Sequence, residues 1–187
     1  MQPHYGITVP WVAFGVYWLI SAVKTRPTVR REGFAARYGI MLIEALGFIL
    51  LFNRDFNIGP LSRHVLNQST ATANLGILLT WAGISLAIWA RFHLGQFWSG
   101  RITLKEGHQL IRAGPYRRLR HPIYTGIDLA AIGTALVLNR WRCVLGVVVI
   151  MMGFVVKAKR EEALLSGQFG DAFAEHRRHT GFLLSKF

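Results

Sequence analysis

Five long apolar stretches, separated by strongly basic segments, constrain this chain more than any other feature of its sequence. The stretches are Ile7–Val23, Tyr38–Phe52, Ala73–Ala90, Ile123–Leu138 and Cys143–Val156. A helix needs about 20 residues to cross the hydrocarbon of a bilayer, with about 17 as the lower limit. The second, fourth and fifth stretches are shorter than that, so polar flanks must extend them or the bilayer must thin locally. The sequence therefore predicts an all-α, polytopic membrane bundle with about five transmembrane helices.

Basic residues are distributed very unequally between the segments that separate these stretches. The chain is 52% hydrophobic and carries 22 Lys and Arg against nine acids, a formal net charge of +13. Eighteen of the 22 follow the first, third or fifth stretch, and four lie on the opposite side. Cytoplasmic loops carry the excess of Lys and Arg in membrane proteins, so we expect the N-terminus outside and the C-terminus in the cytoplasm. Because the charges flank apolar spans, we do not expect nucleic-acid binding.

The organisation of the chain is that of one domain. It has no Pro-rich or Gly/Ser-rich linker and no repeat with a period of about 20–50 residues. We therefore expect 1–187 to form a single integral-membrane domain, with N-terminal transmembrane helices in 1–90 and a functional core in 91–187. Cys143 is the single cysteine, which excludes an intrachain disulfide framework, and no metal site is predicted. The first ten residues lack a basic region, so we expect the first stretch to remain as an anchor.

Two polar stretches flank the last two apolar segments on the side expected to be cytoplasmic. The first comprises residues 107–124. Within it, Gly114–Pro115 predicts a turn, and Pro122 predicts the first turn of the following helix. Arg120 and His121 would then lie at a helix N-terminus, where free N–H groups favour an anion.

The second polar stretch, 157–162, continues the last apolar segment. Lys157 and Glu161 are four residues apart and share a helix face. Residues 139–142 are too few for anything but a tight reversal, so the last two helices are predicted to be antiparallel neighbours. Small residues on both would let their backbones approach closely. They are Gly126, Ala130, Gly133, Gly146 and Gly153. The two polar stretches are thereby expected to meet at the cytoplasmic mouth of this hairpin.

Each of these features has a simpler interpretation when it is taken alone. The basic cluster at 117–120 would anchor to lipid headgroups, the charges of the second stretch would form a surface ion pair, and His121 would be an interfacial histidine. Glu44 and Asp128 carry a charge inside apolar stretches, where charge is costly, and both are left without a role. The prediction of a functional site depends on the hairpin that brings the two polar stretches together.

The combination of motifs resembles a known family. The segments that carry the resemblance are Gly114–Pro115–Tyr116, Arg120–His121–Pro122–Ile123–Tyr124–Thr125–Gly126, Glu161–Glu162 and Phe169–Gly170, with Arg91–Phe92–His93–Leu94–Gly95 and Trp98–Ser99 upstream. Together they resemble the isoprenylcysteine carboxyl methyltransferase family over roughly residues 91–180, about half of the chain.

The resemblance implies an integral-membrane enzyme that transfers a methyl group from S-adenosyl-L-methionine to the carboxylate of a lipid-like or prenylcysteine-type acceptor. The products would be a methyl ester and S-adenosyl-L-homocysteine. The cofactor pocket would lie between the last helical hairpin and the cytoplasmic segments. The implied cofactor contacts are His108, Gln109, Leu110, Ile111, Tyr116, His121, Pro122, Ile123, Tyr124 and Glu161, with Arg101 in a looser alignment. Lys157, Glu161 and Arg120 are the expected catalytic residues.

The chain departs from the family pattern at a few positions. Lys157 stands where the family usually has an arginine, and a lysine offers a point charge in place of a bidentate fork. Phe173 and His176 stand at positions that are commonly tyrosine, and Ser185 lies near the place of a usual proline. The change at 157 bears on the acceptor more than on the cofactor.

Three other interpretations stay open. A phospholipid N-methyltransferase has a similar C-terminal signature, an NADPH-dependent membrane reductase of the sterol type has a comparable layout, and a non-catalytic scaffold would keep the motif for structure. A soluble nucleotide-fold methyltransferase is not supported, because no G-x-G-x-x-G motif is present. We expect membrane lipids and a lipophilic acceptor as partners, and no obligate protein partner.

Overall fold

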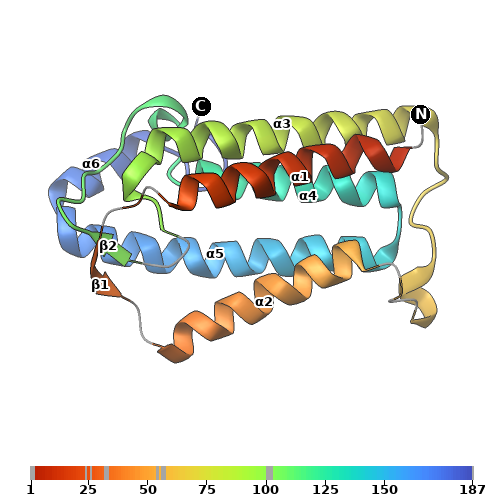
Figure 1. The fold of residues 1–187 in the computed structure, drawn as a ribbon, viewed down its shortest axis with the longest axis horizontal. Coiled ribbons are helices and arrows are strands. Elements are labelled where there is room, and N and C mark those ends of the chain that lie inside the picture. Colours follow the sequence, from red (N-terminus) through yellow and green to blue (C-terminus); the bar gives the residue numbers. More distant parts are fainter. Residues whose placement is uncertain are drawn as a thin grey trace.

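Five apolar helices occupy the five predicted stretches and make up most of the molecule (Figure 1). They are α1 (Pro3–Ala22), α2 (Phe34–Phe52), α3 (Thr70–Leu94), α4 (Pro122–Leu138) and α5 (Trp141–Phe169). The structure is a computed structural model that describes residues 3–23, 25, 27–31, 34–53, 55, 58–99 and 103–186. By length and composition, Tyr5–Ala22, Thr70–Phe97 and Trp141–Phe169 are able to cross a membrane, whereas Tyr38–Phe52 and Pro122–Leu138 are shorter apolar helices. The prediction of an all-α, polytopic membrane fold is confirmed.

Short elements connect these helices. Three are 3-10 turns, η1 (Gly59–Ser62), η2 (Gly95–Phe97) and η3 (Gly114–Arg117), and one is a short helix, α6 (Asp171–His179). The sequence pattern did not predict the antiparallel pairing of strands β1 (Thr28–Arg31) and β2 (Thr103–Lys105). This small ribbon joins the α1–α2 connection to the segment that follows η2.

Two close helix pairs, α3 with α4 and α2 with α5, form the frame of the bundle (Figure 1). A Cβ atom placed on Gly126 of α4 would lie 2.6 Å from the carbonyl oxygen of Gly83 in α3. A Cβ atom on Gly146 of α5 would lie 2.8 Å from the carbonyl oxygen of Gly47 in α2. Both distances are too short for any side chain, so glycine is what permits the backbones to approach this closely.

The expectation that the small residues of α4 and α5 face one another is wrong. Gly133 of α4 lies against Gly76 and Thr80 of α3, and Gly153 of α5 lies against Glu44 of α2. The small faces of the two hairpin helices therefore point toward two different partners. Larger side chains join α4 to α5 instead. The rings of Tyr124 and Phe154, for example, stack with centroids 4.7 Å apart.

The antiparallel arrangement of α4 and α5 is nevertheless as predicted. Asn139 ends α4 in a left-handed conformation with φ of 51°. Its side-chain oxygen accepts a hydrogen bond from the Leu66 N–H at 2.9 Å, and its amide donates to the Leu66 carbonyl at 2.8 Å. Asparagine tolerates this backbone conformation better than most residues. The reversal therefore places the start of α4 beside the far half of α5.

Two buried arginines hold the C-terminal ends of α1 and α2. Arg142 of α5 donates to the carbonyl of Leu50 at 2.8 Å. Arg91 of α3 donates to the carbonyl of Ser21 at 2.6 Å and to that of Gly95 at 2.7 Å. The last carbonyls of a helix lack partners within it and carry partial negative charge, which a guanidinium neutralises. These contacts fix where α1 and α2 end relative to the other helices.

Candidate active site

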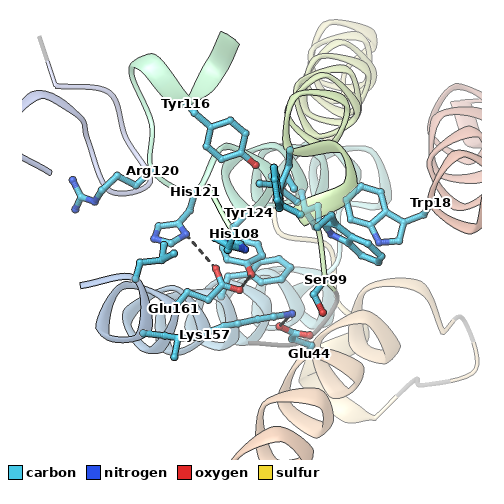
Figure 2. A pocket seen from close by; sticks show the side chains of 18 of the residues that line it. Trp18, Glu44, Ser99, His108, Tyr116, Arg120, His121, Tyr124, Lys157 and Glu161 are labelled. Atoms are coloured by element: carbon cyan, nitrogen blue, oxygen red, sulfur yellow. Dashed lines mark hydrogen bonds and ion pairs between the residues drawn. The ribbon is translucent and has the colours of Figure 1, made fainter. Parts of the chain in front are cut away.

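A cavity of about 340 Å³ lies among all five long helices at the end of the bundle where α4 begins (Figure 2). One part of its wall is polar and comes from the start of α4, from α5, from α2 and from the connection between α3 and α4. The polar residues are Glu44, Ser99, His108, Arg120, His121, Tyr124, Lys157 and Glu161. The opposite part is aromatic and comes chiefly from α1, α2 and the η2 region. Its residues include Phe14, Trp18, Phe48, Phe97 and Trp98.

The hairpin brings the two polar stretches together, as the sequence predicted. Tyr124 of α4 donates a hydrogen bond of 2.5 Å to one oxygen of Glu161, and Nδ1 of His121 lies 3.5 Å from the other (Figure 2). Pro122 begins α4, so His121 is its N-cap residue and Tyr124 lies in its first turn. Both partners of Glu161 thus come from the first residues of one helix. The carboxylate is held in a defined position at the cavity wall.

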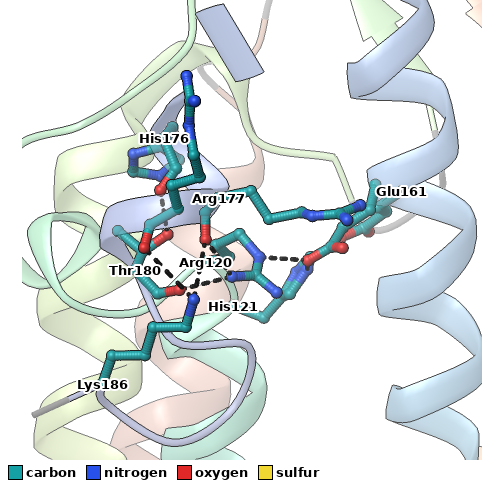
Figure 3. A network of polar contacts seen from close by, with 9 residues as sticks. Arg120, His121, Glu161, His176, Arg177, Thr180 and Lys186 are labelled. Atoms are coloured by element: carbon teal, nitrogen blue, oxygen red, sulfur yellow. Dashed lines mark hydrogen bonds and ion pairs between the residues drawn. The ribbon is translucent and has the colours of Figure 1, made fainter. Parts of the chain in front are cut away.

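Glu162, which the sequence analysis did not single out as a site residue, anchors the neighbouring groups. Its Oε1 accepts from Nε of Arg120 at 2.5 Å and lies 3.2 Å from Nε2 of His121. Arg120 also donates to the carbonyl of Thr180 at 2.6 Å (Figure 3). The guanidinium of Arg120 is therefore bound within the protein on two sides. Its position suits it to orient His121 rather than to hold an external anion.

The C-terminal segment supports this cluster from outside. Arg120 N–H donates to the carbonyl of Gly181, and Gly181 N–H donates to that of Arg118, both at 2.9 Å. The ring of Phe182 packs edge-on against His121 with centroids 5.3 Å apart. Sequence spacing contained no signal for these contacts, because they link residues about 60 positions apart through backbone groups.

The pKa of His121 reflects its two acidic neighbours. Burial lowers this pKa, but the hydrogen bonds to Glu161 and then to Glu162 outweigh burial, so the pKa stands above its usual value. Burial and the charge of Glu161 raise the pKa of Tyr116 well above its usual value, which keeps that phenol protonated. The two carboxylates therefore favour the imidazolium form of His121 over the neutral ring.

Lys157 has a partner that the sequence analysis left unassigned. Its Nζ lies 3.2 Å from Oε1 of Glu44 in α2, and these side chains are only 13% and 17% exposed (Figure 2). The ammonium also lies 5.5 Å from the ring centre of Tyr124 and 5.9 Å from that of Phe154. Lys157 and Glu161 do share the face of α5 that lines the cavity. The alternative that the second polar stretch forms only a surface pair is wrong, because both residues are largely enclosed.

A second, smaller cavity of about 60 Å³ adjoins the first and shares several of its wall residues. The segment 108–111 lines it, after a turn in which Gly107 has φ of 58°. The lining residues are Leu94, His108, Gln109, Leu110, Ile111, Tyr116, Arg120, His121, Leu165, Phe173 and His176. The two cavities therefore share a wall to which His108, Tyr116, Arg120 and His121 contribute.

Most of the predicted site residues therefore lie at this site. His108, Tyr116, Arg120 and His121 line both cavities. Ile123, Tyr124, Lys157 and Glu161 line the larger one, and Gln109, Leu110 and Ile111 line the smaller.

Two of the predicted site residues do not fit that pattern, and neither does Asp128, to which the sequence analysis gave no role. Pro122 is buried but lines neither cavity, so its contribution is to begin α4. Arg101 lies outside the described residues. Asp128 is buried in α4, away from both cavities.

Comparison with known proteins agrees with this arrangement. The model of the isoprenylcysteine carboxyl methyltransferase (ICMT) family matches residues 75–167. A protein-S-isoprenylcysteine O-methyltransferase of Schizosaccharomyces pombe is 32% identical over 110 residues, which cover 57% of this chain and 46% of that protein. Protein-S-isoprenylcysteine O-methyltransferase A of Arabidopsis thaliana is 29% identical over 114 residues, covering 59% of this chain and 58% of that one. An uncharacterized protein of Bacillus subtilis, YpbQ, is 33% identical over 57 residues, covering 26% of this chain and 34% of that one.

The matching region spans about half the length of the curated relatives. The region that the family model matches, residues 75–167, contains most of α3, all of α4 and nearly all of α5. It therefore contains both polar stretches that build the site. Helices α1 and α2, which supply Trp18 and Glu44 to the cavity, lie before it. Because the match extends over α3, α4 and α5, we conclude that the chain belongs to the isoprenylcysteine carboxyl methyltransferase family.

Proposed function

We propose that this protein is a membrane methyltransferase that uses S-adenosyl-L-methionine to methylate the carboxylate of a lipophilic, prenylcysteine-type acceptor. The observation that carries the proposal is a pair of adjoining cavities, the larger of which is lined by a positioned carboxylate, Glu161, together with aromatic side chains. The names of the relatives, which are isoprenylcysteine O-methyltransferases, support the same reaction. The products would be a methyl ester and S-adenosyl-L-homocysteine.

The residues present fit this cofactor. A sulfonium cation is stabilised by a nearby carboxylate and by aromatic faces, and Glu161 and Tyr124 offer both at the cavity wall. The segment 108–111, with Phe173, surrounds the smaller cavity with apolar and polar groups together, which suits a purine ring. We therefore assign cofactor contacts to 108–111, Tyr116, His121 and Glu161.

The aromatic part of the wall of the larger cavity fits a lipophilic acceptor. Phe14 and Trp18 of α1 and Phe48 of α2 all line the larger cavity. An isoprenoid chain buried there gains about 25 cal/mol for each Å² of apolar surface removed from water. The acceptor carboxylate would then reach the polar part of the wall of the larger cavity, near Lys157.

The reaction demands alignment more than acid–base chemistry. When bound, S-adenosyl-L-methionine supplies an electrophilic methyl group. Held beside Glu161 and Tyr124, the cofactor would supply this methyl group to the acceptor carboxylate, and its sulfur would keep the electron pair of the broken S–C bond. The acceptor arrives ionised, so no general base is required, and in-line positioning accounts for much of the rate. In this scheme Lys157 orients the acceptor, Tyr124 and His121 hold Glu161, and Arg120 holds His121 through Glu162.

The decisive experiment measures both products and cofactor affinity. Purified protein in lipid nanodiscs, supplied with methyl-labelled cofactor and N-acetyl-S-farnesylcysteine, should give a labelled ester that releases methanol in mild base. A base-stable product formed on membrane lipid would instead identify a phospholipid N-methyltransferase. Calorimetric binding of NADPH without binding of S-adenosyl-L-methionine would identify a reductase.

Glu161→Gln should lower the affinity for S-adenosyl-L-methionine at least tenfold, about 1.4 kcal/mol, because the sulfonium loses its counter-charge. Glu175→Gln is the matched control, since Glu175 is 57% exposed and pairs only loosely with Arg112 at 3.8 Å. Unchanged affinity in a folded Glu161→Gln protein would favour the non-catalytic scaffold. The measurement is isothermal titration calorimetry of the cofactor.

A further inference from the structure

The ion pair between Glu44 and Lys157 lies in the wall of the larger cavity. Close packing of α2 on α5 puts it there. A Cβ atom on Gly47 would come within 2.6 Å of Ile150, and one on Gly153 within 3.2 Å of Cγ of Glu44. Lys157 follows Gly153 by four residues and so lies on the same face of α5. Glu44 reaches the ammonium because glycine lets the two helices approach.

The pair satisfies a charge that would otherwise be enclosed without a counter-ion. Lys157 is 13% exposed and has two aromatic rings beside its ammonium. Removing one partner of such a pair leaves an uncompensated charge in a poorly solvated place, which is strongly unfavourable. Glu44 therefore occupies the position beside Lys157 that an acceptor carboxylate needs under the proposed function.

An incoming carboxylate cannot simply join this pair. Glu44 and Glu161 both line the same cavity and carry the same sign as the ligand. Repulsion between like charges is weakly screened among aromatic side chains, because the local dielectric is low. A carboxylate reaches Lys157 favourably only when Glu44 gives up that contact.

We propose that Glu44 is a specificity-determining residue that acts as an internal placeholder for the acceptor carboxylate and competes with it for Lys157. This inference rests on the proposed function, and it extends the site to α2, outside the region that the family model matches. The pairing of Glu44 with Lys157 leaves no net charge on these two residues before an acceptor binds. The competition selects acceptors whose lipophilic tail supplies the binding energy, since exchanging one carboxylate for another at Lys157 adds little.

The test is direct binding, measured without methyl transfer. Trp18 and Trp98 line the cavity, so tryptophan fluorescence in nanodiscs reports occupancy. The probes are N-acetyl-S-farnesylcysteine and its methyl ester, which has the same tail but no charge. Wild-type protein should bind acid and ester with affinities within about fivefold of each other, because the acid must displace Glu44. Acid binding more than tenfold tighter than ester binding would overturn the proposal without any variant.

The two partners of the pair should respond in opposite directions. Glu44→Gln, which keeps shape and removes charge, should tighten acid binding at least fivefold. Lys157→Met should weaken it at least fivefold, and both variants should bind the ester within twofold of wild type. An ion pair with a purely structural role predicts changes of the same sign in the two variants, and that result would contradict the proposal.

Failure of this inference is distinguishable from failure of the proposed function. If the acid and ester bind as expected but no methyl ester forms, Glu44 retains its role and the reaction is wrong. If ester forms but Glu44→Gln leaves acid binding unchanged or weaker, the reaction stands and the placeholder is wrong. Glu175→Gln, a remote change of the same chemistry, should leave both ligands unaffected.

Discussion

His121 lies between the two carboxylates of the site. Its ring nitrogens face Glu161 and Glu162, and Arg120 pairs with the same oxygen of Glu162. Tyr124 stacks on the ring with centroids 5.6 Å apart, and Phe182 packs on its edge. An imidazolium in this position donates to both carboxylates, whereas a neutral imidazole serves only one of them as a donor. The protonation state of His121 therefore matters for stability.

The first prediction concerns the pH dependence of that stability. Because the folded protein raises the pKa of His121, its contribution is fully present below the unfolded value of about 6.5 and is lost as pH rises through the folded pKa. The melting temperature of wild type should exceed that of His121→Gln most at about pH 6, and the difference should shrink toward alkaline pH. Thermal melts in detergent at stepped pH values provide the measurement.

His176 provides the matched control with the opposite sign. Burial, followed by the charges of Arg112 and Arg120, lowers its pKa. Its protonation on acidification should therefore destabilise the folded protein. The melting temperature of His176→Gln should accordingly rise relative to that of wild type as pH falls. Parallel pH profiles for the two variants would contradict the assignment of charge at His121.

At the scale of elements, glycine faces determine which helices pair. A Cβ atom on Gly133 would meet α3, and a Cβ atom on Gly146 would meet α2, each within 3.0 Å. The sequence shows that α4 and α5 both have small faces, but it does not show toward which helix each face turns. That choice depends on the lengths and tilts of all five helices. It is the reason that α2, far from α5 in sequence, supplies Glu44 to the site.

We predict that Gly47→Leu destabilises the protein by about 1–3 kcal/mol, because the new side chain overpacks the α2–α5 contact. Its Cβ atom would lie 2.6 Å from Ile150 and 3.0 Å from the carbonyl oxygen of Gly146. Gly15→Leu is the control in α1, since no atom lies within 4 Å of a Cβ atom placed there. That change should be neutral or slightly stabilising, since leucine favours helix over glycine. Equal losses in thermal melts would mean that close packing of α2 on α5 does not limit stability.

At the scale of the whole molecule, the distribution of basic residues indicates how the bundle is oriented in the membrane. The site lies at the end of the bundle that holds the start of α4 and the far half of α5 (Figure 1). Most of the Lys and Arg residues flank the helices at that end. From the positive-inside rule we propose that this end of the bundle faces the cytoplasm.

This orientation predicts the accessibility of introduced cysteines. Cys143 is buried, so its replacement by Ser gives a background free of thiols. Asn67, before α3, and Gln168, near the end of α5, are both exposed. In intact cells a membrane-impermeant maleimide should label Asn67→Cys and should label Gln168→Cys only after the membrane is permeabilised. The reverse pattern would place the site on the outer face.

The sequence by itself determined the number, order and approximate limits of the apolar helices, the tight reversal between α4 and α5, and the meeting of His121 with Glu161. These features follow from short-range rules: apolar length, the backbone preferences of proline, and the spacing of residues along one helix. Only the tertiary structure decided that the small face of α4 packs on α3 and the small face of α5 on α2. The sequence had predicted that these two faces would pack on one another. The partners of Lys157 and Arg120 were decided by the tertiary structure as well. Such contacts join residues 42 to 113 positions apart, and they depend on how whole helices pack, which no local pattern in the chain encodes.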